Sequence, residues 1–124
     1  MKRQRRSDTA PEMAVRRMVS AAGVRYRLNN AKLPGSPDLS NLTQGWAIFV
    51  HGCFWHGHRN CKRATVPKGN RAFWIAKIAA NRARDSRKCR ELRKKGLRVL
   101  TVWECKTRKA DSLASLLRKK GVLP

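Results

Sequence analysis

The sequence predicts a layered α/β domain in which a central sheet carries helices on both faces. Residues 46–50 are five consecutive apolar residues without alternation, as in a strand that is covered on both sides. Residues 97–103, rich in Val, Leu and Thr, predict a second buried strand. Between them, residues 70–95 place Phe, Trp, Ile and Ala side chains at helical spacing, and Gly96 ends this helix. A chain of 124 residues (1–124) has the length of a single domain.

The N-terminal third predicts a helix followed by a strand. A helix opens at Pro11, because proline needs no amide partner in the first turn, and Ser7 or Asp8 is the expected cap. Gly23 is expected to stop it. Residues 24–28 then alternate apolar residues with arginine, which is typical of a half-buried strand.

Two further segments complete the predicted order of elements. Residues 33–37 read as a turn, and the polar stretch that follows, up to Gly45, has no clear secondary-structure pattern. Near the C-terminus, residues 112–120 form a short amphipathic helix with Gly121 after it.

The charge of the chain indicates a polyanionic partner. Thirty Lys and Arg residues against seven Asp and Glu residues give a net charge of +23, which is self-repelling in a compact body. Nucleic acid is the expected partner, and residues 1–7 are expected to form a basic, mobile arm that contacts phosphates. Charge does not separate DNA from RNA, and it favours a passive binding protein over an enzyme.

The composition also bounds where the protein acts. The sequence has no run of eighteen or more apolar residues and no secretory leader pattern. We therefore expect no membrane partner and a cytoplasmic protein associated with nucleoid DNA. We also expect a monomer.

The cysteines and one histidine predict a structural zinc site. Cys53, His58 and Cys61 follow the pattern C-x4-H-x2-C, and Cys105 comes just after the second buried strand. Zinc binds four such ligands tetrahedrally, and a complete set leaves no open position for catalysis. The alternatives are ordinary buried thiols or disulfides, and Cys89, inside the predicted helix, is the thiol left over.

Two other histidines lie beside this set. His51 ends the buried strand and His56 follows in the next turn, where catalytic groups often collect, although a lone histidine is more often structural. Asp38 is one of only seven acidic residues and comes at a predicted strand start, so it could bring a carboxylate beside the histidines and bind Mg²⁺.

These residues resemble the successive sequence blocks of the very short patch repair (Vsr-type) mismatch endonucleases. The most specific block contains His51-Gly-Cys-Phe-Trp-His56. Blocks of the resemblance occur in order at residues 8–12, 33–38, 48–56, 73–74 and 99–105. The resemblance implies a restriction-endonuclease-like fold, with a central mixed sheet flanked by helices. It also implies a Mg²⁺-dependent DNA repair enzyme that nicks duplex DNA 5′ to the mismatched thymine of a T:G pair, with mismatch-repair proteins as possible partners.

The resemblance also implies roles for individual residues. Asp38 and the main-chain carbonyl of Val50 would hold Mg²⁺, and His56 would activate the attacking water. Asp85 would orient His56, and His51 would polarise the scissile phosphate. Glu12 matches a family carboxylate near the site, although its place at a helix start also explains an acidic residue.

Three aromatic residues match family positions that wedge into DNA beside the mismatch. They are Phe54, Trp55 and Trp74, for which core packing is the alternative, whereas Phe73 is expected in the core.

The sequence departs from the family pattern in three places. Val50 stands where well-known members carry threonine, which matters only if the side chain binds metal. The interval from Cys53 to Cys61 is one residue longer than in some relatives, and residues 40–45 are unusually polar. A nuclease that cuts paired DNA for a mobile element or defence system, or a decayed zinc-dependent DNA-binding module, therefore stays open.

Overall fold

The sheet of the computed structural model, which describes residues 9–59 and 61–124, is mixed and has four strands. The predicted mobile arm, residues 1–7, lies outside the described residues. The first two strand pairs are antiparallel and the last is parallel, in the order β1-β2-β3-β4. The strands are β1 (Arg27–Leu28), β2 (Leu39–Asn41), β3 (Trp46–His51) and β4 (Arg98–Trp103).

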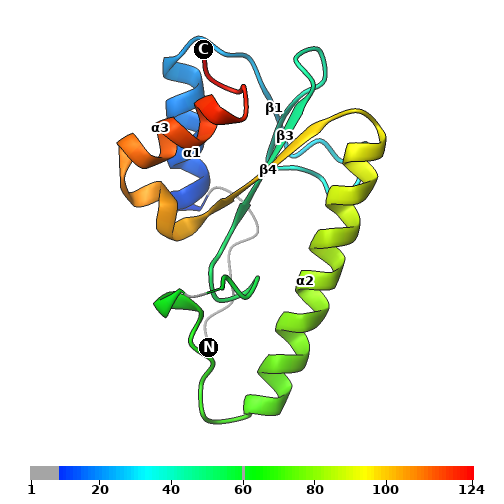
Figure 1. Cartoon of the computed structure of the whole chain (residues 1–124), viewed down its shortest axis with the longest axis vertical. Coiled ribbons are helices and arrows are strands. Elements are labelled where there is room, and N and C mark those ends of the chain that lie inside the picture. The colour runs from blue at the N-terminus through cyan, green and yellow to red at the C-terminus, as the bar shows by residue number, and fades with distance from the viewer. Residues whose placement is uncertain (1–8, 60) are drawn as a thin grey trace.

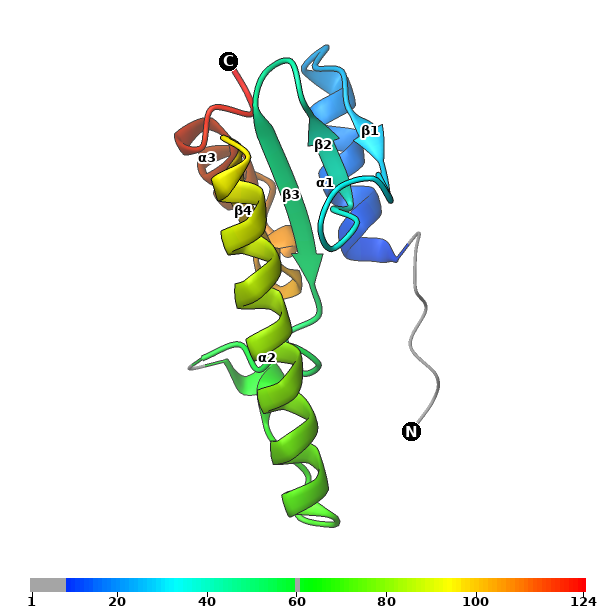
Figure 2. The same cartoon turned by 90° about the vertical axis from the view of Figure 1, so that its right-hand side faces the viewer.

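Helices cover both faces of this sheet, which confirms the predicted α/β fold class. Helices α1 (Ala10–Ala21) and α3 (Ala110–Lys119) lie together on one face, and α2 (Arg71–Lys94) covers the other (Figures 1 and 2). Two short 3-10 helices, η1 (Lys62–Ala64) and η2 (Glu104–Arg108), follow the ends of β3 and β4. In the described part of the chain, no helix is both long and apolar enough to cross a membrane.

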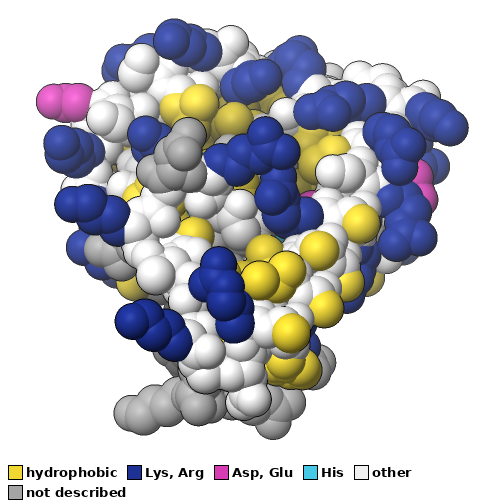
Figure 3. Space-filling view, turned by 60° about the horizontal axis from the view of Figure 1, so that its bottom comes forward, with side chains coloured by type: hydrophobic (Ala, Val, Ile, Leu, Met, Phe, Trp, Pro, Cys, Tyr) yellow, Lys and Arg dark blue, Asp and Glu magenta, His cyan; other side chains and the backbone are white. Residues whose placement is uncertain are grey.

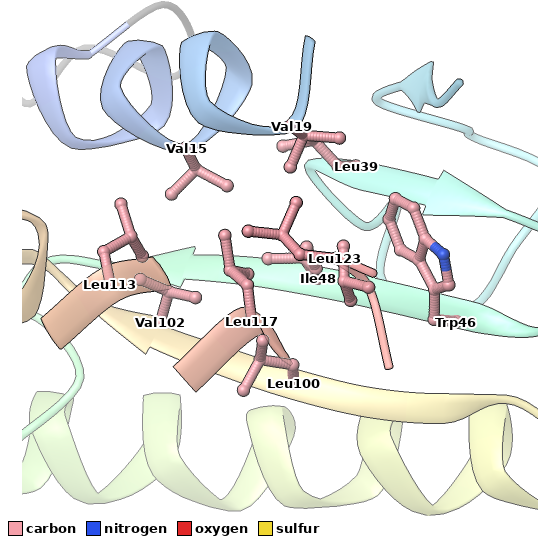
Figure 4. Packing of buried hydrophobic residues seen from close by; sticks show 11 residues of the cluster. Val15, Val19, Leu39, Trp46, Ile48, Leu100, Val102, Leu113, Leu117 and Leu123 are labelled. Carbon is pink, nitrogen blue, oxygen red and sulfur yellow. The ribbon is translucent and has the colours of Figure 1, made fainter. Parts of the chain in front are cut away.

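The core explains why β3 lacks alternation. Figure 4 shows Val15 of α1 and Leu113 of α3 facing Ile48 of β3, within the larger of two buried clusters. On the opposite face, Ala47 and Phe49 of the same strand pack in a second cluster with Leu92, Leu97 and Val99. Because side chains alternate across a strand, both faces of β3 need apolar residues.

The start of α1 differs from the prediction. The helix begins at Ala10, and its N-cap is Thr9, whose hydroxyl accepts a hydrogen bond from the Glu12 amide at 3.4 Å. The predicted caps, Ser7 and Asp8, lie outside the described residues, and the cap role that we gave them was wrong because Thr9, also a favoured N-cap residue, directly precedes the helix.

The predicted strand over residues 24–28 is shorter than expected, and one strand was missed. Only Arg27 and Leu28 pair with β2, and Leu28 is 43% exposed because β1 is an edge strand. Val24 and Tyr26 do pack against the core. The missed strand is β2, whose Ser40 and Asn41 have low β-propensity and are held by pairing to β3.

Helix α2 is much more exposed than its apolar spacing predicts. Its N-terminal half extends beyond the end of the sheet (Figure 2), so that Phe73 is 56% and Ile75 47% exposed. The prediction that Phe73 lies in the core was therefore wrong, because no layer reaches that part of the helix. Ile78 and Leu92 are its buried residues. Apolar and basic side chains lie next to each other on this end of the molecule (Figure 3).

Candidate active site and metal centre

The turn after β3 carries two sets of side chains that point to different partners. Strands β3 and β4 are parallel with His51 opposite Trp103, so both carboxyl ends meet at one edge of the sheet. His51 is the last residue of β3 and residues 52–58 follow it, while η2 with Cys105 follows β4. This topology brings together residues about fifty positions apart in the chain.

One set is the predicted cluster of Cys53, His58, Cys61 and Cys105. One ligand atom from each lies within 4.8 Å of every other, and the Cys105 sulfur lies 3.5 Å from His58 Nδ1. Zinc–sulfur bonds of about 2.3 Å place the sulfurs of a tetrahedral site about 3.8 Å apart. The four residues therefore fit a zinc ion with little rearrangement.

Burial sets the protonation of the cluster when no cation is bound. It raises the pKa of the Cys53 thiol to about 12, so without a cation this thiol keeps its proton at neutral pH. Burial, with the charge of Lys106, lowers the pKa of His58, which keeps the imidazole neutral and able to bind a metal. The Glu104 carboxylate accepts a hydrogen bond from the Cys53 amide at 3.1 Å and so holds the turn against η2.

The second set is His51, His56 and Asp85. Asp85 of α2 lies 2.6 Å from Nδ1 of His56 and 3.9 Å from Nδ1 of His51. The two imidazoles stack with centroids 3.8 Å apart and planes 6° from parallel. Trp103 contacts His51 through its ring edge and stacks on His58, so it touches both sets.

The charges of these groups follow from their surroundings. Burial raises the pKa of Asp85, but the hydrogen bond with His56 and the nearby positive charges hold it below its usual value. The carboxylate is therefore ionised and accepts a hydrogen bond from His56 Nδ1–H. Burial and the charge of His56 lower the pKa of His51 to about 4, so His51 is neutral at pH 7.

Asp38 lies at the same end of the sheet, immediately before β2 begins to pair with β3. Its carboxylate accepts a hydrogen bond from the Val50 amide at 2.6 Å. The N–H and C=O of one strand residue point toward the same neighbouring strand, so the Val50 carbonyl faces the Asp38 side as well. The Val50 side chain packs against the core, which means that only its backbone is directed to this site.

Asp38 and Glu12 line one pocket of about 470 Å³ with the histidines and Asp85. Burial raises the pKa of Asp38 to about 6, its hydrogen bond from Val50 opposes the rise, and the charge of Glu12 adds to it. Glu12 is 5% exposed and pairs with Arg16 at 3.4 Å. Buried carboxylate oxygens beside a backbone carbonyl form an oxygen donor set that suits Mg²⁺.

The three predicted wedge residues form one aromatic group at the end of the turn. Phe54, Trp55 and Trp74 contact each other edge to face, with centroids 5.2 to 5.7 Å apart, and all three are partly exposed. They are therefore not core residues.

The turn is fastened to α2 by close contacts. The Asn81 amide donates to the Trp55 carbonyl at 2.8 Å. A Cβ added to Gly57 would lie 2.5 Å from Ile78 Cγ2, so only glycine allows this approach.

Sequence reasoning missed two residues of this region, Glu104 and Lys88. Glu104, one of seven acidic residues, immediately precedes Cys105 of the predicted zinc cluster, and that position was a usable signal. Lys88 also lines the pocket but is one of thirty basic residues, so no sequence pattern singles it out. Cys89, the cysteine outside the zinc set, packs against the second core cluster.

The fold and this site together define a class of protein. A mixed sheet flanked by helices, with carboxylates and a His–Asp pair at the ends of its strands, is the architecture of a nuclease with a restriction-endonuclease-like fold.

Comparisons with known proteins identify the family. The family described as DNA mismatch endonuclease Vsr matches residues 1–63. The chain is 43% identical over 118 residues to the type II nicking enzyme V.XorIIP of Xanthomonas oryzae pv. oryzae, covering 95% of this chain and 86% of the relative. It is 41% identical over 106 residues to the DNA mismatch endonuclease Vsr of Escherichia coli, covering 86% and 67%. The type II nicking enzyme V.NmeAIP of Neisseria meningitidis is 42% identical over 98 residues, covering 79% and 69%. The chain belongs to the Vsr family and is a DNA endonuclease.

Proposed function

We propose that the protein is a Mg²⁺-dependent endonuclease that nicks duplex DNA 5′ to the mismatched thymine of a T:G pair. The observation that carries this proposal is the His56–Asp85 pair at 2.6 Å, in the same pocket as Asp38, in a chain of the Vsr family. Of the three relatives named above, two are nicking enzymes and one is a mismatch endonuclease, which supports cleavage of one strand at a mismatch.

In this proposal, His56 is the general base. Its Nδ1–H donates to Asp85, so its Nε2 can accept a proton from water. The water oxygen then forms a bond to phosphorus while the bond from phosphorus to O3′ breaks, and the leaving oxygen takes a proton from solvent. The products carry a 3′-hydroxyl and a 5′-phosphate.

Asp38 and the Val50 carbonyl would hold Mg²⁺, and Glu12 adds a second buried carboxylate to that side of the pocket. Bound there, the ion supplies positive charge next to the phosphate. His51 is neutral, so it would polarise a phosphate oxygen as a hydrogen-bond donor and not as a cation.

Phe54, Trp55 and Trp74 would supply mismatch selectivity. Inserting aromatic side chains into a base step costs a few kcal/mol of stacking, a cost that is lowest where pairing is already weak. The partly exposed aromatic group stands beside His56 in the chain and meets α2, whose basic side chains can contact phosphates.

The test is a panel of end-labelled duplexes incubated with the protein and Mg²⁺. The panel contains one T:G mismatch, the fully paired sequence and the equivalent RNA duplex. We expect nicking only in the T:G duplex, in the strand that carries the mismatched thymine. Brief treatment with EDTA, too short to remove zinc, should abolish this nicking. If the fully paired duplex is nicked equally well, the protein is a nicking enzyme for paired DNA and not a mismatch-repair enzyme. No cleavage of any duplex, with DNA binding retained, would contradict the proposal and indicate a decayed nuclease.

A matched variant tests the aromatic group separately. Trp55→Ala should reduce the preference for T:G over paired DNA, whereas Phe73→Ala, an exposed aromatic outside the predicted set, should change it less. If both variants keep the wild-type preference, the aromatic group does not select the mismatch.

A further inference from the structure

Lys88 lies on α2 one turn after Asp85 and lines the active-site pocket. A Cβ built on Gly35 would lie 2.6 Å from Lys88 Cδ and 3.0 Å from Cγ. The lysine stem therefore rests directly on the backbone of Gly35, in the loop that leads to Asp38. This contact fixes the stem between α2 and that loop.

Lys88 also belongs to the pocket that contains the candidate catalytic groups. Lys88 and Gly35 line the same pocket as Asp38, His51 and Asp85. The charge of Lys88 is one of the causes that lower the pKa of both His51 and Asp85. Its charge therefore acts on the groups that surround the proposed phosphate position.

No carboxylate of the described residues lies within ion-pair distance of Lys88. The ion pairs found in that part of the chain join Arg16 to Glu12, and His51 and His56 to Asp85. Asp85 is held by His56, so the lysine charge is available to a ligand. A lysine ammonium is a compact point charge that binds phosphate oxygens strongly.

We propose that Lys88 is a further catalytic residue, whose ammonium binds a non-bridging oxygen of the scissile phosphate. The negative charge on that oxygen grows as the bond from water to phosphorus forms and the bond to O3′ breaks, so the contact stabilises the transition state more than the ground state. The assignment rests on the proposed nuclease function of this pocket, and it adds to the pocket a cation supplied by the protein itself.

The test separates catalysis from DNA binding. Single-turnover nicking of the T:G duplex at saturating enzyme and Mg²⁺ gives the rate, and binding with Ca²⁺ in place of Mg²⁺ gives Kd. Lys88→Met should lower the rate by about 100-fold, the size found for removal of one transition-state donor. Its Kd should change no more than that of Lys77→Met, an exposed lysine on the same helix outside the pocket.

Two further variants keep the result interpretable. Lys88→Gln removes the charge and keeps the carbons through Cδ that contact Gly35, so it should show the same rate loss at an unchanged melting temperature. Lys88→Arg should recover part of the rate because it restores the charge. A rate within twofold of wild type for Lys88→Gln, or a rate loss matched by an equal loss of binding, would overturn the proposal. Failure of the wild type to nick would instead remove the proposed function, and this assignment with it.

Discussion

His56 and His58 lie two residues apart in one turn, yet the fold gives them different partners. His56 meets the carboxylate of Asp85 on α2, whereas His58 meets the sulfur of Cys105 after β4. A carboxylate orients an imidazole as a base, while thiols and an imidazole form a ligand set for zinc. The comparison teaches that the role of each histidine is set by the element that delivers its partner.

The largest effect is expected from removing a cysteine of the predicted zinc cluster, to which His58 belongs. Cys105→Ala removes one of four ligands, and a structural zinc site contributes on the order of 10 kcal/mol, comparable to the whole stability of a small domain. We expect loss of bound zinc and of the folded state, measured by metal analysis and circular dichroism. Cys89→Ala is the control and should keep both. A folded, zinc-free Cys105→Ala protein would mean that the fold does not depend on zinc bound to this cluster.

Removing His56, which pairs with the Asp85 carboxylate, should lower the nicking rate without changing the fold. His56→Ala removes the proposed base, and general-base removal lowers rates by about 10² to 10⁴-fold. Zinc content and melting temperature should stay at the wild-type values, because His56 is outside the thiol cluster. His58→Ala is the contrasting control, since it should lose zinc. If His56→Ala loses zinc as well, the two sets do not have separate tasks.

Asp38, in the same pocket as His56, should make the stability of the protein depend on pH. Its pKa in the folded protein is about 6, above the usual 3.8, so the stability that it contributes is fully present below pH 3.8 and is lost as pH rises through 6. Asp38→Asn does not ionise, and its amide oxygen can still accept from the Val50 amide. In zinc-loaded, magnesium-free protein at pH 7 to 8, we expect this variant to be more stable by about 1 to 3 kcal/mol.

Urea unfolding at pH 4 and pH 8 measures this gain, which should be near zero at pH 4. The same variant should lose nicking, because the proposed Mg²⁺ ligand is gone. A variant less stable than wild type at pH 8 would show that the buried carboxylate is not a cost to the fold.

The smallest effect is expected where the two sets touch. Trp103 stacks on His58 at 4.2 Å and contacts His51 by its edge at 5.4 Å. Aromatic contacts of this kind contribute about 0.5 to 1.5 kcal/mol, so Trp103→Leu should lower the stability by about that amount and the nicking rate by a few-fold. Trp103→Phe should recover most of both. An unchanged nicking rate with reduced stability would mean that Trp103 supports only the predicted zinc cluster and not the His51 set.

Much of the fold could be predicted because its strongest signals are local. The apolar run of β3 and the spacing of α2 depend on residues close in sequence, and both elements lie within a residue of the predicted positions. Strand β2 was missed because its polar residues become a strand only by pairing with β3. The exposure of Phe73 could not be read from spacing, since it depends on where the sheet ends.

The site was predicted unevenly for a similar reason. The cysteines and histidines are rare residues, so their spacing along the chain is informative by itself. Their grouping into two sets is seen in the geometry, but their chemical roles stay predictions. No sequence pattern distinguishes Lys88 from the other basic residues, because only the folded structure shows that it packs on Gly35 and lines the pocket.

The extension of α2 beyond the sheet has a dynamic consequence. The helix is about 36 Å long, and its N-terminal half is fastened to the turn through Asn81, Ile78 and Trp74. Without a sheet beneath it, this half depends on that turn for its tertiary contacts. We therefore expect opening of the turn and fraying of the first helical turns to be coupled, so that amide hydrogen exchange in residues 71–82 would report how often the candidate metal centre opens.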